Sequence, residues 1–292
     1  MNYFKYMPII FALITFAGWG VGDIFVTLAS RKLGAKQTYF WGMAFAFLLS
    51  SLYLPFAGKM SDWGMFFVAT VLNIVHIFGN LCYFRGLEVG NAAIVGTLSG
   101  SFALVTILIS VLFFGESLTA LQILAVILTL TGGVLVSLNL GKSAKLSGIL
   151  SDKGIIYALG SVFGWGIYFA LVRIPAGKIG WFWAGFPLYL LNFLLPLFMK
   201  DFRKNASLIF SKKNVWQTVL TFSVLITLAD FSYNIGILKG FTSIVAPIAG
   251  AYPVLFVLLT SIFFKEKLTK QQKIGLGLGL LGIVVISFSS IG

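Results

Sequence analysis

Two carboxylates inside an otherwise apolar chain are the residues with the clearest chemical potential. Asp23 and Asp230 each stand within a long run of apolar residues. A charged group at the centre of a membrane-spanning helix costs about 2.5 to 3.5 kcal/mol, so each one needs a protein, solute or water partner. Uncharged residues could fill a structural role at lower cost. We therefore expect the aspartates to bind an ammonium group or a proton.

Helical spacing places polar and aromatic side chains beside both aspartates. Residues three or four apart share one face of a helix. The face around Asp23 comprises Thr15, Trp19, Asp23 and Thr27, the face around Asp230 comprises Ser223, Thr227, Asp230 and Asn234, and a third face comprises Asn73, His76, Asn80 and Tyr83. We predict that the three faces line one aqueous cavity.

Several of these side chains have a second interpretation. His76, the sole histidine, could exchange protons with an aspartate or be a hydrogen-bonded core residue. Trp19 and Trp165 could form cation-binding walls, since an aromatic face attracts ammonium groups within about 6 Å, or they could simply pack. Asn73 and Ser223, with Thr15, could line the cavity or form interhelical hydrogen bonds worth about 0.6 kcal/mol each.

The composition indicates which elements must position these residues. Hydrophobic residues make up 59% of the chain and charged residues only 10%, against about 25% in soluble domains, which excludes a water-soluble fold. Apolar segments of about 20 residues are long enough to cross a membrane as helices. We predict an all-α integral membrane protein with ten transmembrane helices, at 8–28, 38–57, 63–86, 92–114, 120–140, 154–172, 181–199, 214–238, 242–264 and 273–290.

An internal repeat organises these segments. Residues 83–138 match residues 233–288 without a gap, at an offset of 150 residues, and the repeat keeps polar positions in register. The sequence Gly-Trp-Gly at 18–20 recurs at 164–166. Five spans per half is an odd number, so the second half enters the membrane from the opposite side. We predict two inverted five-helix repeats, residues 1–141 and 154–292, joined by a loop at 142–153.

The repeated motifs resemble a known family. They are GWG in the first span of each half, YFRGLEVGNAAIVG at 83–96, and FFGESLTALQ at 113–122 with its copy FFKEKLTKQQ at 263–272. Together they are similar to the EamA-like branch of the drug/metabolite transporter superfamily. The resemblance implies ten helices around a central cavity and transport of amino acids, other metabolites, nucleotide precursors or drugs, often for export. The inverted repeat by itself favours a secondary-active transporter that works by alternating access, and we expect it in the cell membrane.

We therefore expect a carrier for an amine-containing solute, with an amino acid and export favoured. A multidrug or cationic-compound exporter, and a channel or lipid-moving protein, are the alternatives. The expected partners are the small-molecule substrate, membrane lipids and a coupling proton; no nucleic acid is expected, and oligomeric state stays open. The expected substrate-binding residues are Trp19, Asp23, His76, Asn80, Tyr83, Trp165, Asp230, Tyr233 and Asn234, and the proton-coupling candidates are Asp23, Asp230 and His76.

Enzymatic function is disfavoured by the residues available. The chain has one histidine and one cysteine, Cys82, and no recognisable spacing of catalytic or metal-ligating residues. No cofactor or metal is expected. Lys and Arg residues sit in loops beside the predicted spans, where topology and anionic lipid account for them.

The sidedness of these basic residues leaves the orientation open. Sixteen of the 21 Lys and Arg residues fall on one side of the predicted topology, and five fall on the other: Lys5, Lys59, Arg173, Lys178 and Lys239. The positive-inside rule then places both termini outside the cytoplasm, whereas the family resemblance places them inside. The charge distribution receives slightly more weight.

Two further local patterns concern helix ends and breaks. Pro247 and Pro253 interrupt the ninth predicted span, so we expect a kink with a role in gating there that the first half need not share. Thr119 with Gln122, and Thr269 with Gln272, fit capping boxes at helix starts. Glu116 and Glu266 precede these boxes and are expected to stabilise the same helix ends.

Overall fold

The computed structural model describes residues 6–89, 95, 98–137, 154–195, 214–263, 265 and 267–290. Within these ranges all regular structure is helical. Among the described residues, eight helices are long and apolar enough to cross a membrane, and Leu98–Phe114 is a shorter apolar helix. The predicted connecting loop, Glu266, and parts of the predicted spans at 92–114, 120–140, 181–199 and 242–264 lie outside the described residues.

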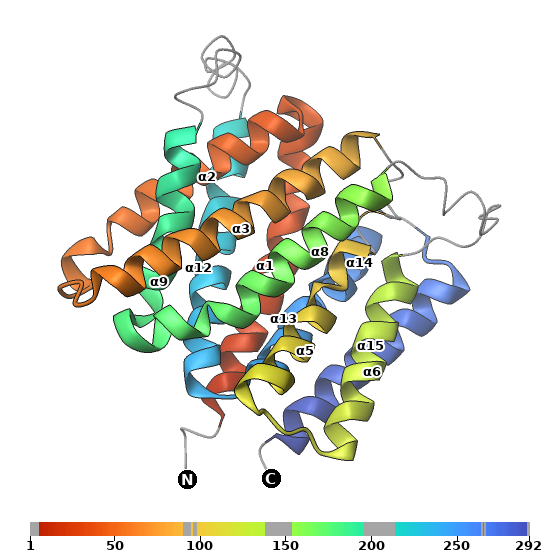
Figure 1. Cartoon of the computed structure of the whole chain (residues 1–292). Coiled ribbons are helices and arrows are strands. Elements are labelled where there is room, and N and C mark those ends of the chain that lie inside the picture. Colours follow the sequence, from red (N-terminus) through yellow and green to blue (C-terminus); the bar gives the residue numbers. More distant parts are fainter. Residues whose placement is uncertain are drawn as a thin grey trace.

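The helices follow the predicted order (Figure 1). The first half contains α1 (Met7–Leu33), α2 (Ala35–Ser51), the short η2 (Leu54–Phe56), α3 (Trp63–Val89), α5 (Phe102–Phe114) and α6 (Ala120–Ser137). The second contains α8 (Gly154–Leu171), α9 (Arg173–Leu194), α12 (Val215–Lys239), α13 (Thr242–Gly250), α14 (Tyr252–Phe263) and α15 (Lys270–Ser289). Each of the ten predicted spans therefore contains helix.

The second half is inverted relative to the first, as predicted. In Figure 1, α1 and α3 run away from the side where both chain ends lie, whereas α8 and α12 run toward it. The halves are also interleaved, because α1 packs against α12, α3 against α8 and α6 against α15. The site described below consequently draws its side chains from both halves.

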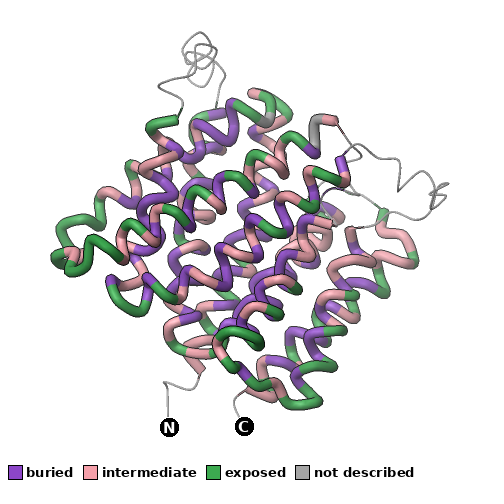
Figure 2. Tube along the Cα trace, in the orientation of Figure 1, coloured by how far each residue is buried: buried purple, intermediate pink, exposed green. Residues whose placement is uncertain are grey.

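Apolar side chains face outward as well as inward, which is the arrangement that a lipid environment requires. Buried positions gather on the inward faces of the helices in Figure 2, and exposed positions on the outer faces and turns. Large apolar side chains on the outside include Leu112, Phe113 and Phe288, which are 74%, 77% and 74% exposed. Such exposure would be unfavourable in water and is favourable in a bilayer. The chain is an integral membrane protein.

A glycine in the left-handed region marks the same turn in both halves. Gly34 has φ 85°, and Gly180 has φ 84°, a backbone region that side chains with a Cβ rarely adopt. Gly34 separates α1 from α2, while Gly180 kinks α9. The seventh predicted span, at 181–199, is thus the second part of a longer helix that starts at Arg173.

A helix break also occurs at equivalent positions of both halves. Ser101 (φ −76°, ψ 3°) precedes α5, and Ala251 (φ −76°, ψ 1°) separates α13 from α14. The second copy carries Pro247 within α13 and Pro253 in the first turn of α14, but the first copy carries no proline at these positions. The break therefore forms with prolines in one copy and without them in the other. The gating role of Pro247 and Pro253 stays a prediction.

Candidate functional site

A cavity of about 560 Å³ lies between the two halves. Side chains from α1, α2, α3, α5, α8, α9, α12 and α14 line it. It extends from Trp19, near the middle of α1, to Arg31, close to the end of α1. Because the chain ends lie at the other side of the molecule (Figure 1), the cavity opens on the side opposite to them.

The two tryptophans at equivalent positions of the repeat make the same kind of hydrogen bond beside the cavity. Trp19 Nε1 donates to Asp230 Oδ1 at 2.8 Å, and Trp165 Nε1 donates to Asn80 Oδ1 at 2.8 Å. Trp19 is equivalent to Trp165, and Asn80 to Asp230, in the sequence repeat. Each pair joins a first helix of one half to a third helix of the other.

A tyrosine completes each of these pairs. The Tyr189 hydroxyl donates to Asp230 Oδ2 at 2.9 Å, so both carboxylate oxygens of Asp230 accept a hydrogen bond. The Asn80 amide donates to the Tyr39 hydroxyl at 3.2 Å, and Tyr39 donates to Asn192 Oδ1 at 2.7 Å. The hydrogen bonds from Trp19 and Tyr189 thus fix the orientation of the Asp230 carboxylate.

Asp23 differs from Asp230 in having no such support. Among the residues that the structure describes, none forms a hydrogen bond or ion pair with its carboxylate, which lines the cavity. The walls around it are aromatic and include Tyr83 and Tyr252. A half-buried carboxylate in this setting is available to a cation or a proton that enters the cavity.

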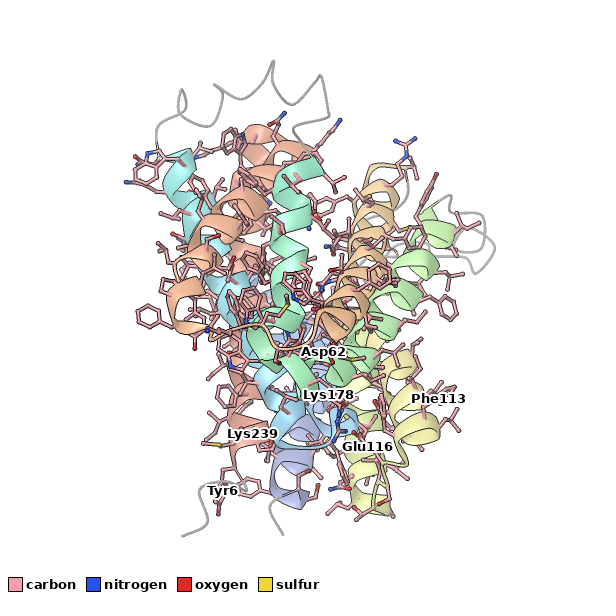
Figure 3. All side chains as sticks on the ribbon, turned by 60° about the vertical axis from the view of Figure 1, so that its left-hand side comes forward. Tyr6, Asp62, Phe113, Glu116, Lys178 and Lys239 are labelled. Carbon is pink, nitrogen blue, oxygen red and sulfur yellow. The ribbon has the colours of Figure 1, made fainter. Side chains whose placement is uncertain are left out.

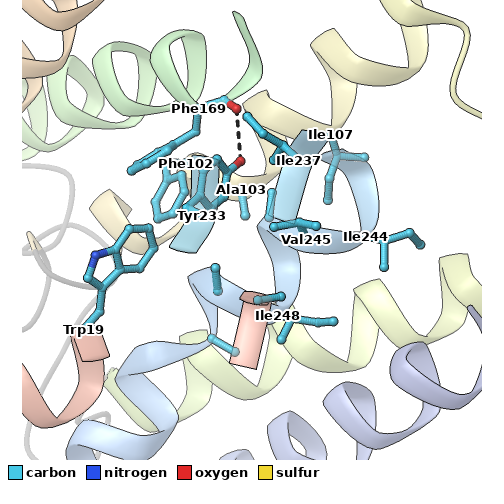
Figure 4. Packing of buried hydrophobic residues seen from close by; sticks show 14 of the residues in the cluster. Trp19, Phe102, Ala103, Ile107, Phe169, Tyr233, Ile237, Ile244, Val245 and Ile248 are labelled. Carbon is cyan, nitrogen blue, oxygen red and sulfur yellow. Dashed lines mark hydrogen bonds between the residues drawn. The ribbon is translucent and has the colours of Figure 1, made fainter. Parts of the chain in front are cut away.

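Aromatic side chains close the inner end of the cavity. The Trp19 ring lies 6.1 Å from that of Tyr233, nearly parallel to it, and 5.3 Å from the ring of Phe169. The Tyr233 hydroxyl donates to the Phe169 carbonyl at 3.0 Å (Figure 4). Behind this layer, Val245 and Ile248 are fully buried. The structure is thus open at one end and sealed at the other.

Glu116 lies at the sealed end and contacts the other half of the chain. Its carboxylate accepts the backbone N–H groups of Thr242 at 2.8 Å and Ser243 at 2.7 Å, and it forms an ion pair with Arg173. In Figure 3, Glu116 lies toward the same end of the molecule as Tyr6. The expectation that Glu116 stabilises the helix after it was wrong, because it caps α13 instead.

The predicted capping boxes themselves are present. Thr119 and Gln122 exchange hydrogen bonds at the start of α6, with the Thr119 N–H donating at 2.9 Å and the Gln122 N–H at 3.3 Å. Thr269 and Gln272 do the same at α15. These side chains satisfy N–H groups of their own helices, which leaves Glu116 free to serve α13.

Seven of the nine predicted substrate-binding residues line the cavity: Trp19, Asp23, His76, Asn80, Tyr83, Trp165 and Asp230. The other two do not line it, since Tyr233 is buried beneath Trp19 and Asn234 is 2% exposed, with its amide 3.4 Å from the Trp181 carbonyl. The substrate-binding role of all nine stays a prediction.

His76 is a buried residue that also contacts the cavity, and its role in proton exchange stays a prediction. It is buried and stacks on Tyr168 at a ring distance of 4.3 Å, yet it also lines the cavity. Its Nδ1 has no hydrogen-bond partner among the described residues. A core position and access to the cavity are therefore compatible for this side chain.

The interhelical interpretation holds for three other polar residues. Thr15 donates to the Ala229 carbonyl at 3.0 Å, Asn73 to the Ala184 carbonyl at 2.8 Å and Ser223 to the Gly42 carbonyl at 2.9 Å. All three side chains are buried outside the cavity lining. They connect helices within the membrane, as polar side chains often do there.

Sequence reasoning missed the tyrosines of the second helices. Tyr39 and Tyr189 hydrogen-bond to the two equivalent residues Asn80 and Asp230. They stand 150 residues apart, the same offset that relates the third helices, so the repeat carried a signal for them. No group of three or more His, Cys, Asp or Glu residues that could hold a metal ion is found within the described ranges.

Comparison with known proteins assigns the family. The model of the EamA-like transporter family matches residues 6–138 and again residues 152–288. The chain belongs to the EamA-like transporter family. This EamA-like protein is accordingly a membrane transporter of small solutes, and its two matched regions agree with the inverted repeat seen in the helices.

Two further matches to this EamA-like transporter extend the comparison. An uncharacterized protein of Methanocaldococcus jannaschii is 30% identical over 87 residues, which are 30% of this chain and 64% of that protein. A solved crystal structure of a protein superimposes with a TM-score of 0.77 over 97% of both chains at 18% sequence identity. At that identity the likeness supports the shared fold alone.

Proposed function

We propose that this EamA-like transporter is a secondary-active carrier of the cell membrane that exports a small amine-containing metabolite, with an amino acid favoured, by alternating access. The observation that carries the proposal is the carboxylate of Asp23, which faces an aromatic cavity without a hydrogen-bond or ion-pair partner among the described residues. A carboxylate in apolar surroundings gains most from a cationic ligand.

The shape and walls of the cavity favour a small solute. Its volume of about 560 Å³ falls within the range of about 300 to 1,000 Å³ that is usual for small-molecule sites. The rings of Trp19 and Trp165 border the cavity and offer faces to a cation. Their indole N–H groups are already engaged with Asp230 and Asn80, so the rings are held in place before a ligand arrives.

The same carboxylate would also bind the coupling proton. Asp23 would be neutralised either by an ammonium group or by a proton, so the two would compete for one site. Exchange of one for the other as the cavity opens to alternate sides would couple their movements. Transport that is independent of a pH gradient in vesicles would remove this part of the proposal.

The export direction rests on the charge distribution. The open end of the cavity lies beside Arg31, on the side that carries sixteen of the 21 basic residues in the predicted topology. The positive-inside rule assigns this side to the cytoplasm, so the cavity would load from within the cell. Labelling of an introduced surface cysteine in intact cells would decide the orientation.

The first experiment is a thermal-stability screen of the purified protein against amino acids, amines, nucleosides, sugars and cationic drugs. A ligand present at 100 times its dissociation constant stabilises the folded state by about 2.7 kcal/mol. We expect amines to raise the melting temperature of the wild type and of Asp62→Asn, which removes an exposed carboxylate outside the cavity, but not of Asp23→Asn.

Other outcomes would point to the alternative functions. Stabilisation by bulky cationic drugs but not by amino acids would favour a multidrug exporter. A ligand shift that survives in Asp23→Asn would contradict the role of that carboxylate. If no solute raised the melting temperature and proteoliposomes showed no saturable counterflow, a channel or lipid-moving function would replace the carrier.

A further inference from the structure

One buried carboxylate bridges the two halves at the sealed end of the cavity. Glu116 lies in the connection between α5 and α6 of the first half, and it is 4% exposed. Its three partners, Arg173 and the N–H groups of Thr242 and Ser243, all belong to the second half. We propose that these four residues form a latch that keeps this end of the transporter closed, a role that rests on alternating access.

The position of the latch explains why opening must break it. Arg173 begins α9, directly after α8, and Thr242 begins α13. Phe169 of α8 and the buried face of α13 also form the aromatic and aliphatic seal beneath the cavity. A passage through this end requires these second-half elements to part from the first half. The Glu116 contacts cross that boundary and include its ion pair with Arg173.

The chemistry of the latch suits a contact that forms and breaks. Hydrogen bonds to an ionised acceptor are about twice as strong as neutral ones, and the start of α13 adds the positive end of its dipole. The Arg173 guanidinium also lies 5.8 Å from the Phe114 ring centroid. When this end opens, water can solvate the separated charges, so the latch contributes mainly to the choice between conformations and less to overall stability.

The accessibility of introduced cysteines measures the balance between the closed and open conformations without any substrate. In a Cys82→Ala background, one variant carries Ala103→Cys as a probe of the sealed end, because Ala103 is fully buried next to Phe102. A second variant carries Thr27→Cys as a probe of the open cavity, which Thr27 lines. Each purified protein is treated in detergent micelles with a water-soluble thiol reagent, and the labelling rate is measured.

Glu116→Gln should raise the labelling rate at position 103 by about tenfold or more, since it replaces charge-assisted contacts with weaker neutral ones. The rate at position 27 should fall or stay the same. Asp62→Asn, the matched control, removes an exposed carboxylate that accepts the Met65 N–H, its one hydrogen-bond donor within the described ranges, and should change neither rate. Arg173→Gln should act in the same direction as Glu116→Gln.

Arg173→Gln also serves if Glu116→Gln fails to fold, because Arg173 is partly exposed and its loss leaves the two N–H contacts in place. The latch proposal would be contradicted if the folded variant has a lower melting temperature than the wild type but is labelled at position 103 at the wild-type rate. The test is separate from the ligand screen, so a failed search for substrates would leave its result standing.

Discussion

Trp19 donates its indole N–H to Asp230 across the interface between the halves, at 2.8 Å. The equivalent Trp165 makes the same bond to Asn80, also at 2.8 Å. One interaction therefore occurs twice around the pseudo-two-fold axis, with a carboxylate acceptor in one copy and an amide acceptor in the other. This difference in charge makes the two copies a natural comparison.

Equivalent substitutions of the two tryptophans should have unequal costs. Trp19→Phe removes a donor from a charged acceptor, worth about 1.5 to 3 kcal/mol, whereas Trp165→Phe removes one from a neutral acceptor, worth about 0.5 to 1.5 kcal/mol. Both changes delete the same indole group, so each is the control for the other. Thermal unfolding in detergent should show the larger loss for Trp19→Phe; equal losses would mean that Asp230 is neutral or hydrated there.

The two aspartates should respond differently to neutralisation. In Asp230→Asn the amide oxygen can still accept from Trp19, as Asn80 does from Trp165, so ligand affinity should fall no more than about fivefold. Asp23→Asn should lower the affinity for an amine by at least about tenfold. Its melting temperature without ligand should stay equal or rise, because the lost carboxylate has no partner among the described residues. Calorimetric titration with a hit from the screen would measure both affinities.

A larger effect of Asp230→Asn than of Asp23→Asn would reverse the assignment. Asp230 would then be the group that meets the ligand, and its bonds to Trp19 and Tyr189 would have to break on binding. Tyr189→Phe distinguishes the cases, because it frees one Asp230 oxygen without removing charge. The ligand affinity of Tyr189→Phe should match that of Asp230→Asn if Asp230 only positions Trp19.

The crossing of α6 and α15 should not tolerate a methyl group. A Cβ on Gly132 would lie 2.3 Å from the Gly279 nitrogen and 2.5 Å from its Cα, so the two backbones would have to separate. We expect Gly132→Ala to cost about 1 to 3 kcal/mol. Gly133→Ala is the control, since nothing lies within 4 Å of its added Cβ, and it should be neutral or slightly stabilising. Similar melting temperatures for the two variants would show that these helices are not in close contact.

Proline substitutions test the predicted gating role of the ninth span. Pro253 lies in the first turn of α14, where its missing N–H has no helical partner to lose, so Pro253→Ala should leave the melting temperature nearly unchanged. Pro247→Ala adds an N–H inside α13 that can reach the Ser243 carbonyl, so it should raise the melting temperature. If Pro247 serves gating, the stiffer helix should also slow counterflow; unchanged counterflow would assign this proline to packing alone.

The membrane architecture could be predicted because its causes are local. Apolar segments of about 20 residues must form helices, since the bilayer offers no partner for free backbone groups. The repeat at an offset of 150 residues, with an odd number of spans per half, then required the inversion that the helices show. The glycines at 34 and 180 recur because both copies use a left-handed turn there.

The partners of individual side chains were less predictable. The sequence placed Glu116 before the α6 capping box, and only the fold brought it to the start of α13, 126 residues away. Likewise, Tyr189 and Trp19 reach Asp230 from different halves. Such pairs depend on which helices of the two interleaved halves become neighbours, and helical periodicity does not encode that choice.

The sequence alone established that this is a duplicated, helical membrane protein with two aspartates on polar helix faces. Hydropathy and helical spacing are properties of single segments, so they can be read without knowing how the segments pack. The tertiary structure decided that Asp230 is held by Trp19 and Tyr189 while Asp23 has no partner among the described residues. It also decided which end of the cavity is closed, with Glu116 bridging the halves there. Those differences arise between segments far apart in the chain, where only packing sets the distances.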